Sequence, residues 1–385
     1  MERPVYLDYN ATTPVDPRVV KAMIPYLYEQ FGNASSAHQY GYEANVAMER
    51  ARGQMARLLG AKPAEVVFTG GGSETDNLAI KGVVFANLTK KPHVVTTSIE
   101  HPAVLNTVRY LEHRFGAECT IVPVDEFGLV DPDGIRAALR PNTVLVTVMH
   151  ANNEVGTLQP IEEIGRITRE RGILLHVDAA QSAGKIPIDV EALGVDLLAV
   201  AGHKIYGPKG MGALYIRRGT VIDPLVHGSG QEHGMHAGTQ NVASMVGLGL
   251  AAELAAEDLP EEGPKLIALR DCLQTLLAER IPGLMLNGHP ERRLPNTLNV
   301  SLPGALGPAV LAYAPGVAAS TGSACHSGVN DPSPVLTAMG LPVDRALGAL
   351  RLSLGRWSTN EDVERATDLL VQGYQAAGSL SPSFS

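Results

Sequence analysis

The sequence predicts an α/β protein whose central sheet is mostly parallel and is covered by helices. Between about residues 60 and 220, short β-rich runs alternate with segments of helical length, which is the pattern of a parallel sheet with crossover helices. The runs are almost entirely apolar, as expected for strands that are buried on both faces. The predicted strands are Glu65–Phe68, His93–Thr97, Val144–Met149, Ile173–Val177, Leu197–Val200 and Gly212–Ile216.

Helical patterns separate these strands and continue after them, and one of them has proline in its first turn. The predicted helices are Glu74–Val84, Pro102–Arg114, Ile161–Arg171 and Ala243–Ala256.

The last third of the chain has a mixed pattern and predicts a smaller α+β domain. It begins after Glu253–Pro264, a stretch rich in acidic residues and proline. The expected elements are a helix near Leu266–Arg280, strands near Thr297–Leu302 and Gly316–Ser320, and a final helix near Glu361–Ala377. A chain of 385 residues suits two domains. We expect a large domain over residues 16–259 and a small domain formed by residues 1–15 and 260–385.

Composition limits the classes of function. The chain has 31 Lys and Arg residues against 40 Asp and Glu, a net charge of −9, which disfavours binding to nucleic acid or to anionic membranes. No apolar run reaches the roughly 18 residues of a membrane helix, and the first ten residues do not resemble a signal peptide. We therefore expect a cytoplasmic protein. The three cysteines, Cys119, Cys272 and Cys325, form no CxxC pair, so neither a disulfide framework nor a metal site is expected.

Polar and glycine-rich segments follow the predicted strands, where an open α/β sheet binds its ligand. They are Thr69–Glu74, Glu100–His101, Asn152–Glu154, Asp178–Gln181 and Gly202–Lys204. The first is a glycine-rich turn that leads into a helix, whose free N–H groups and dipole favour a phosphate. Gly72 and Ser73 are the candidate phosphate contacts. The alternative is a tight connection, and the turn fits neither the Walker motif nor GxGxxG.

Two charged residues in these segments indicate a cofactor. Asp178 ends an apolar strand, where a carboxylate is costly to bury unless it meets a cation such as a protonated pyridine nitrogen. A helix cap or a salt bridge is the alternative. Lys204 lies between a predicted strand and a loop rich in glycine and proline, where a desolvated amine can form a Schiff base. The alternative for Lys204 is ordinary surface charge.

These segments, with others along almost the whole chain, resemble the cysteine desulfurases, which are fold-type I pyridoxal-phosphate (PLP) enzymes related to class V aminotransferases. The motifs are Leu7–Pro14, Phe31–Ser36, the glycine-rich turn, Glu100–His101, His176–Ser182, Gly202–Lys204, Ser323–Cys325 and Arg351–Arg356. The resemblance implies a large domain with a mostly parallel seven-stranded sheet and a smaller α+β domain.

The resemblance also assigns roles. Lys204 would hold PLP covalently, Asp178 would pair with its ring nitrogen, Gln181 would donate to its phenolic oxygen, and His101 would lie over the ring. Further cofactor contacts would come from Gly72, Ser73, Asn153, His203 and, from a second subunit, Thr239, which implies a homodimer. Arg351 would bind the substrate carboxylate, with help from Asn33. Without the resemblance, a structural role for His101, a surface salt bridge for Arg351 and a turn for Asn33 are the simpler interpretations.

Cys325 is the expected sulfur acceptor. It lies in a run of small and polar residues, about 321–334, that is typical of a loop, whereas Cys119 and Cys272 lie in strand-like and helical patterns. The resemblance implies that L-cysteine becomes L-alanine while its sulfur passes to the Cys325 thiolate as a persulfide. An acceptor protein, for example in iron–sulfur cluster assembly or tRNA thiolation, would take the sulfur. His326 is a candidate to assist the thiolate.

Several departures from the family pattern leave alternatives open. Ala201 replaces a serine that usually contacts phosphate, and His236 replaces an arginine and has no assigned role. Cys325–Ser327, followed by Pro332–Leu336, resembles selenocysteine lyase, so L-selenocysteine is the alternative substrate. A class V aminotransferase would not need Cys325. A non-catalytic protein that kept only the fold would not need Lys204.

Overall fold

A seven-stranded sheet forms the centre of the larger body in this computed structural model, which describes residues 3–322 and 331–378. The strand order is β2-β8-β7-β6-β5-β3-β4, and only β8 runs antiparallel to its neighbours. The predicted α/β architecture is therefore confirmed. The strands are β2 (Val66–Thr69), β3 (His93–Thr97), β4 (Glu118–Val122), β5 (Thr143–Met149), β6 (Leu174–Asp178), β7 (Leu197–Ala201) and β8 (Gly212–Ile216).

Helices cover both faces of this sheet because successive apolar residues of each strand point to opposite sides. On one face, Leu145 and Leu197 pack with α4 (Gly72–Ala86) and α5 (Pro102–Phe115). On the other, Val146 and Leu198 pack with α3, α7 and the first part of α9. The bounds are α3 (Gln39–Leu59), α6 (Pro132–Ala138), α7 (Ile161–Arg171) and α9 (Val242–Arg280).

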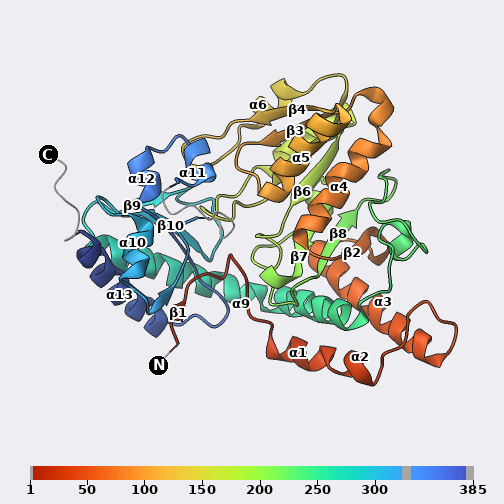
Figure 1. The fold of residues 1–385 in the computed structure, drawn as a ribbon, viewed down its shortest axis with the longest axis horizontal. Helices are drawn as coiled ribbons and strands as arrows, with labels where there is room; N and C mark the ends of the chain where they lie inside the picture. The colour runs from red at the N-terminus through yellow and green to blue at the C-terminus, as the bar shows by residue number, and fades with distance from the viewer. Residues whose placement is uncertain (1–2, 323–330, 379–385) are drawn as a thin grey trace.

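A smaller body is built on a three-stranded antiparallel sheet of order β12-β10-β9. The N-terminal strand β1 pairs with β11, so the start of the chain lies beside its last third (Figure 1). A separate apolar cluster joins Leu7 to residues of α9, β10 and α13. The elements are β1 (Val5–Tyr6), β9 (Met285–Asn287), β10 (Thr297–Ser301), α10 (Gly307–Ala312), β11 (Val317–Ala318), α11 (Pro334–Ala338), α12 (Val343–Leu347), β12 (Ala349–Ser353) and α13 (Asn360–Gly378).

The helix α9 departs from the sequence-based expectation. Two helices were expected on either side of Glu253–Pro264, but one helix of 39 residues continues through Pro260 and Pro264. It crosses the molecule and connects the two bodies (Figure 1). Its first part packs on α3 and its last part on α13, so tertiary packing compensates for the backbone bonds that proline removes. The predicted domain boundary at 259/260 falls inside this helix, and the division itself stays a prediction.

The helix α3 and the short helices before it, α1 (Pro17–Met23) and α2 (Pro25–Tyr28), were not expected from the sequence. The helical spacing of Met48, Met55 and Leu59 was present, and all three are buried against the main sheet. Among residues 3–322 and 331–378, no helix is both long and apolar enough to cross a bilayer.

A buried ion pair holds the segment before α9 against the main sheet. Arg52 of α3 donates to both carboxylate oxygens of Glu232, at 2.7 and 2.9 Å, and the two side chains are 2% and 1% exposed. The same carboxylate accepts from the backbone N–H of Phe68 at 2.7 Å. Glu232 has a φ of 49°, an unfavourable conformation for a residue with a side chain. The pair therefore stabilises a strained loop next to the end of β2.

Replacing Arg52 with Met leaves the Glu232 carboxylate buried without its cation. We expect the free energy of unfolding to fall by about 3–5 kcal/mol. Arg57→Met, on the same helix, is the matched control, because Arg57 pairs with Glu253 at the surface. That loss should stay below about 1 kcal/mol. Urea denaturation of both variants measures the difference, and equal losses would contradict a structural role for the buried pair.

Candidate active site

A cavity of about 530 Å³ lies at the carboxyl ends of the central strands of the main sheet. Its walls come from both bodies: the glycine-rich turn after β2, the ends of β5, β6 and β7, the N-terminal segment, and β12 of the small sheet. The structure brings nine of the predicted site residues together there. They are Gly72, Ser73, His101, Asn153, Asp178, Gln181, His203, Lys204 and Arg351.

The structure does not bring two of the predicted site residues into this cavity, and a third cannot be compared with it. Thr239 lies in a neighbouring, smaller cavity with Gly210 and His236. Asn33 lies on an exposed loop, where its side-chain oxygen accepts from the N–H of Ser35 at 2.9 Å and closes a turn. Cys325 lies outside the described residues.

The N-terminal segment holds Lys204 in place. Lys204 follows β7 in the short 3₁₀ turn η3 (Gly202–Lys204). Its ammonium nitrogen Nζ donates to the backbone carbonyls of Asn10, at 2.5 Å, and Ala11, at 2.8 Å. Two residues after Ala11, Thr13 donates its N–H to the carbonyl of His203 at 3.0 Å. A chain segment 190 residues away therefore fixes the end of the lysine side chain.

Asn10 connects the lysine to the small body. Its backbone carbonyl also accepts from the amide Nε2 of Gln181 at 3.0 Å. Its side-chain nitrogen donates to the hydroxyl of Thr297 at 2.8 Å and to the carbonyl of Asn153 at 3.2 Å. Its N–H donates to the hydroxyl of Ser353 at 2.9 Å. Asn10 is 1% exposed and was not assigned a role from the sequence, although it lies in the first of the matching motifs.

Three buried carboxyl groups lie in or near the cavity: Asp178 and Asp76 line it, and Glu100 adjoins His101, which lines it. Asp178 ends β6 and accepts from the N–H of Ala180 at 2.8 Å. Burial raises the pKa of Asp178, and this is opposed by that hydrogen bond and by the nearby His101 and Lys204. Burial, with the charges of Asp178 and Glu100, raises the pKa of Asp76 well above its usual range. Asp76 lines the cavity from α4 and was missed, since one carboxylate within a helix gives no sequence signal.

Glu100 is the third of these carboxyl groups. Burial raises its pKa to about 8, against the hydrogen bonds that its Oε1 accepts from Thr97, at 2.6 Å, and the N–H of Met149, at 3.0 Å. Its other oxygen, Oε2, is buried and accepts no hydrogen bond from the described residues. Glu100 therefore holds a proton at neutral pH.

His101 is oriented by a hydrogen bond at one of its ring nitrogens. It is the N-cap of α5, and its ring nitrogen Nδ1 accepts from the N–H of Ala103 at 3.1 Å. Pro102, which begins the helix, keeps His101 in an extended conformation. Burial lowers the pKa of His101, so the ring is neutral and carries its proton on Nε2.

The turn after β2 leads into a helix and could hold a phosphate. Gly71, the N-cap of α4, has a φ of 137°, which a side chain would oppose. A Cβ atom added at Gly72 would lie 3.0 Å from the Cβ of Ala201, so this turn packs closely on the end of β7. The first N–H groups of a 15-residue helix are good anion donors. His236, which had no expected role, pairs with Glu74 of this helix at 2.5 Å.

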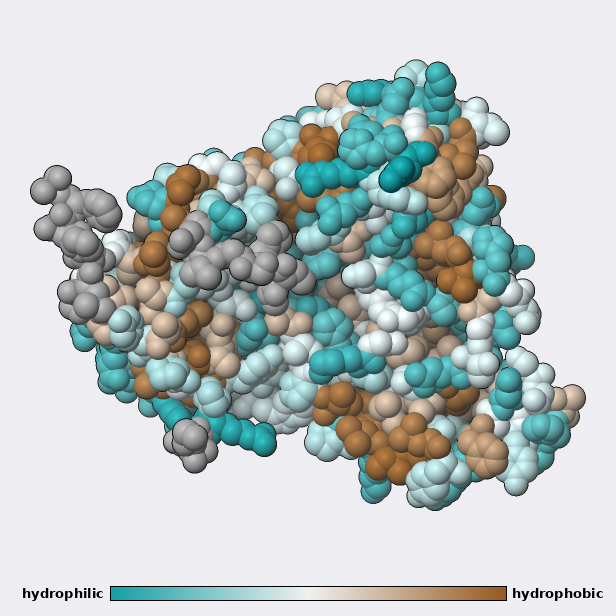
Figure 2. Space-filling model, viewed as in Figure 1, coloured by the Kyte–Doolittle hydropathy of each residue, from teal (hydrophilic) through white to brown (hydrophobic). Residues whose placement is uncertain are grey.

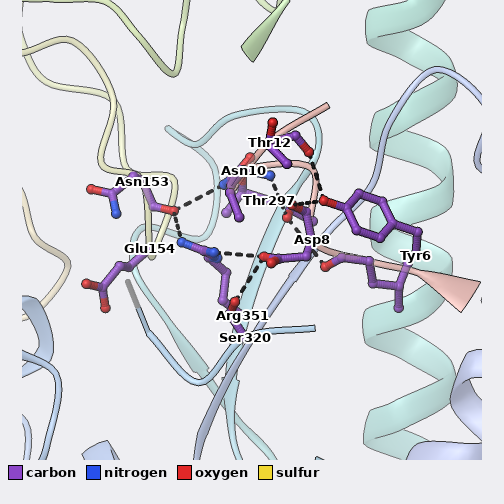
Figure 3. Close-up of polar contacts among 12 residues, drawn as sticks. Tyr6, Asp8, Asn10, Thr12, Asn153, Glu154, Thr297, Ser320 and Arg351 are labelled. Atoms are coloured by element: carbon purple, nitrogen blue, oxygen red, sulfur yellow. Dashed lines mark hydrogen bonds and ion pairs between the residues drawn. The ribbon is translucent and has the colours of Figure 1, made fainter. Parts of the chain in front are cut away.

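Arg351 lines the cavity from β12 of the small body. It is 1% exposed, which excludes a surface salt bridge. Its Nη2 donates to Asp8 at 2.8 Å, and its Nη1 donates to the carbonyl of Asn153 at 3.3 Å (Figure 3). Asp8 in turn accepts from the hydroxyl of Ser320 at 3.0 Å. The guanidinium is therefore oriented before any ligand binds. Asp8 was not assigned a role from the sequence.

The residues around the cavity fit PLP. A buried carboxylate at Asp178 suits a protonated ring nitrogen, the start of α4 suits the phosphate, and the Lys204 amine lies in the same cavity. The volume is sufficient for a cofactor with a small substrate. The sheet and the cavity define a fold-type I enzyme of the PLP-dependent group.

Comparisons with known proteins identify the family. Residues 5–366 match the aminotransferase class-V family. The cysteine desulfurase IscS of Dictyoglomus turgidum is 47% identical over 384 residues, covering 99% of this chain and 97% of that protein. The cysteine desulfurase IscS of Methanosarcina thermophila is 50% identical over 380 residues, covering 98% and 94%. A solved structure of a NifS-like protein has a TM-score of 0.90 at 40% identity, covering 96% and 98%. The chain belongs to the cysteine desulfurases of the class V aminotransferase family.

The raised pKa of Glu100 makes stability depend on pH. The folded chain binds this proton more tightly than the unfolded chain, whose carboxyl has its ordinary pKa of 4.5. Between pH 4.5 and about 8, Glu100 therefore contributes a loss of stability as pH rises, at most about 1.4 kcal/mol per pH unit. Glu100→Gln keeps the acceptor oxygen and cannot ionise.

We expect the unfolding free energy of Glu100→Gln, measured by urea denaturation, to fall less between pH 5 and pH 8 than that of the unchanged protein. Glu112→Gln, which removes an exposed carboxyl near the end of α5, is the control and should keep the original slope. An unchanged slope in Glu100→Gln would show that Glu100 is ionised throughout this range.

Proposed function

We propose that this protein is a PLP-dependent cysteine desulfurase that converts L-cysteine to L-alanine and receives the sulfur on Cys325. The observation that carries the proposal is the convergence of Lys204, Asp178 and Arg351 in one cavity. The chain is also 47% and 50% identical, over nearly its whole length, to two proteins named cysteine desulfurase. A further relative of known structure, with a TM-score of 0.80 at 40% identity, is described as SspA in complex with cysteine.

In this proposal the chain holds PLP through residues of the large body. Lys204 attaches it covalently, Asp178 keeps its ring nitrogen protonated, and Gln181 donates to its phenolic oxygen. Gly72, Ser73 and His203 contact the phosphate, and His101 and Asn153 lie at the ring. When bound, PLP supplies an electron sink that stabilises negative charge at the substrate Cα.

The remaining residues bind the substrate and move its protons. Arg351 is preoriented by Asp8 and donates to the substrate carboxylate, a pairing that suits the planar guanidinium. Lys204 takes the Cα proton with its amine, which the carbonyls of Asn10 and Ala11 direct. His101 remains neutral near the ring and can exchange a proton through Nε2. Asn33 does not line the cavity of its own chain. Its contribution to carboxylate binding would therefore require a contact with a second copy of the chain.

Sulfur transfer would take place at Cys325. Its thiolate attacks the substrate sulfur, a new S–S bond forms, and the C–S bond of the substrate breaks. The electron pair of that bond stays with the Cβ carbon, which takes up one proton, equivalent to the one lost from the Cys325 thiol, and becomes the methyl group of alanine. One cysteine and one thiol give one alanine and one persulfide, so no external oxidant or reductant is needed. L-Selenocysteine would react in the same way, and an acceptor protein would remove the transferred atom.

A homodimer is part of the proposal, with Thr239 reaching the phosphate of the second subunit. Thr239 lies next to the main cavity but does not line it, which suits a contact made to another copy. An apolar surface over α1 and α2 would form part of the dimer interface (Figure 2). Its exposed residues are Val20, Ile24, Leu27, Tyr28 and Phe31.

Replacing Cys325 with Ser removes the thiolate that accepts sulfur. We expect alanine formation from L-cysteine to fall by roughly two orders of magnitude or more, while PLP absorbance of the purified protein is retained. Cys272→Ser is the matched control, because Cys272 is an exposed free cysteine of the described residues and should be dispensable.

Mass spectrometry of the protein after exposure to L-cysteine or L-selenocysteine identifies the residue that gains the additional atom. Unchanged alanine production by Cys325→Ser would refute the role of Cys325. Formation of a keto acid in place of alanine, with amino transfer to a second keto acid, would support an aminotransferase instead.

A further inference from the structure

A second lysine lies beside the candidate site and has no part in the proposed mechanism. Lys185 follows β6 and precedes the short helix α8 (Val190–Leu193), four residues after Gln181. Its Nζ donates to the side-chain oxygen of Gln181 at 2.9 Å and lies 3.4 Å from the side-chain oxygen of Asn10. Lys185 therefore contacts the side-chain amides of Gln181 and Asn10, and the backbone carbonyl of Asn10 binds both Gln181 and Lys204.

The contact determines which end of the Gln181 amide faces the cavity. A primary amide has one accepting end and one donating end, and Lys185 is the donor in its contact with Gln181. With Oε1 held by Lys185, the Nε2 end must point away, and it donates to the carbonyl of Asn10 at 3.0 Å. The donating end of Gln181 is therefore kept at the side chain of Lys204, which binds the same carbonyl.

The same argument applies to Asn10. Its side-chain oxygen accepts from Lys185 and from the side-chain nitrogen of Asn296 at 3.0 Å. Two donors at this oxygen leave the amide nitrogen of Asn10 to donate to Thr297 and to the carbonyl of Asn153. Lys185 thus supports the orientation of both amides in the connection between the two bodies.

The surroundings of Lys185 do not offer the partner of an ordinary salt bridge. Within residues 3–322 and 331–378, Lys185 has no carboxylate within ion-pair distance. Burial, with the positive charges of Lys204 and Arg351, lowers the pKa of Lys185 to about 7, and only the more remote Glu262 opposes this. A partly buried amine without a carboxylate partner is costly to the fold, which indicates a role through the groups that it contacts.

We infer that Lys185 is a positioning residue, which holds the Gln181 amide with its N–H directed toward the cofactor oxygen and acts on the chemistry through that amide. This inference rests on the proposed function, since it needs PLP bound near Gln181. It adds a residue that does not itself touch substrate or cofactor. Its signature is the protonation behaviour of the bound PLP, which a purely structural residue would leave unchanged.

The test uses the PLP-loaded protein and follows the visible absorbance of the cofactor as a function of pH. In Lys185→Met, Gln181 is free to turn and the nearby positive charge is lost. Both changes disfavour the deprotonated cofactor, so the pH midpoint should rise by about one unit. Lys62→Met removes an exposed lysine that is distant from Lys185 in the sequence. This variant is the control and should not move the midpoint. An unshifted midpoint in Lys185→Met would overturn the inference.

Two further variants separate positioning from a direct effect of charge. In a Gln181→Leu background, adding Lys185→Met should shift the midpoint by less than about a third of its effect in the unchanged protein. Lys185→Gln keeps a hydrogen-bond donor without charge and should restore most of the midpoint. If the midpoint shifts fully in the Gln181→Leu background or in Lys185→Gln, Lys185 does not act by positioning Gln181. Lys185→Ala replaces Lys185→Met should that variant fail to fold.

The same experiment distinguishes failure of this inference from failure of the proposed function. If the unchanged protein gains no visible absorbance with PLP, or if Lys204→Ala gains the same covalent absorbance, the proposed function is wrong. If that absorbance appears, depends on Lys204 and titrates identically in Lys185→Met, only the role of Lys185 is wrong.

Discussion

The fixed position of Asn10 is the constraint on which the rest of the site depends. One buried peptide carbonyl accepts from both Lys204 and Gln181, and the side chain of the same residue binds Thr297 in the small sheet. The N-terminal segment is itself anchored in the small body through β1. Because the lysine belongs to the large sheet, the site is complete only when both bodies are folded and in contact. The long helix α9 makes this arrangement possible by passing through both cores.

The charged side chains of the cavity are arranged to pair with charges on a ligand rather than with one another across the cavity. Arg351 already has its counter-ion in Asp8, whereas Asp178 is buried with one backbone hydrogen bond and a raised pKa. Glu100 remains protonated and so adds no second negative charge near Asp178. A group with a cationic ring nitrogen and an anionic phosphate would satisfy Asp178 at one end and the start of α4 at the other. This division of charge explains why acidic and basic residues can share a small, largely buried volume.

The parts of this account that were predictable from sequence are those that depend on local pattern. The bounds of β3, β8 and α7 agree with prediction residue for residue, because each is a short periodic run between clear turn signals. The strand-end motifs also contain eight of the predicted residues that line the cavity, whereas Arg351 was assigned only through the family resemblance. The continuity of α9 was not predictable, since proline is locally unfavourable and only contacts with distant helices compensate for it.

The roles of Asn10, Asp76 and Lys185 were likewise hidden, because they arise from partners far apart in the sequence. Nothing in the residues near Lys185 indicates that it reaches Asn10, 175 positions earlier. Asn33 shows the opposite case: the family motif assigned it to the substrate, while its local sequence indicated the turn that is observed. Resemblance and local pattern therefore gave different information, and the structure was needed to relate the two.

The central claim is that Lys204, and no other amine, attaches the cofactor. Three lysines line or adjoin the cavity: Lys185, Lys204 and Lys209. Borohydride reduction of the PLP-loaded protein, followed by peptide mass spectrometry, identifies the lysine that carries the pyridoxyl group. The account predicts this group on Lys204 alone, and finding it on Lys185 or Lys209, or on no lysine, would contradict the account.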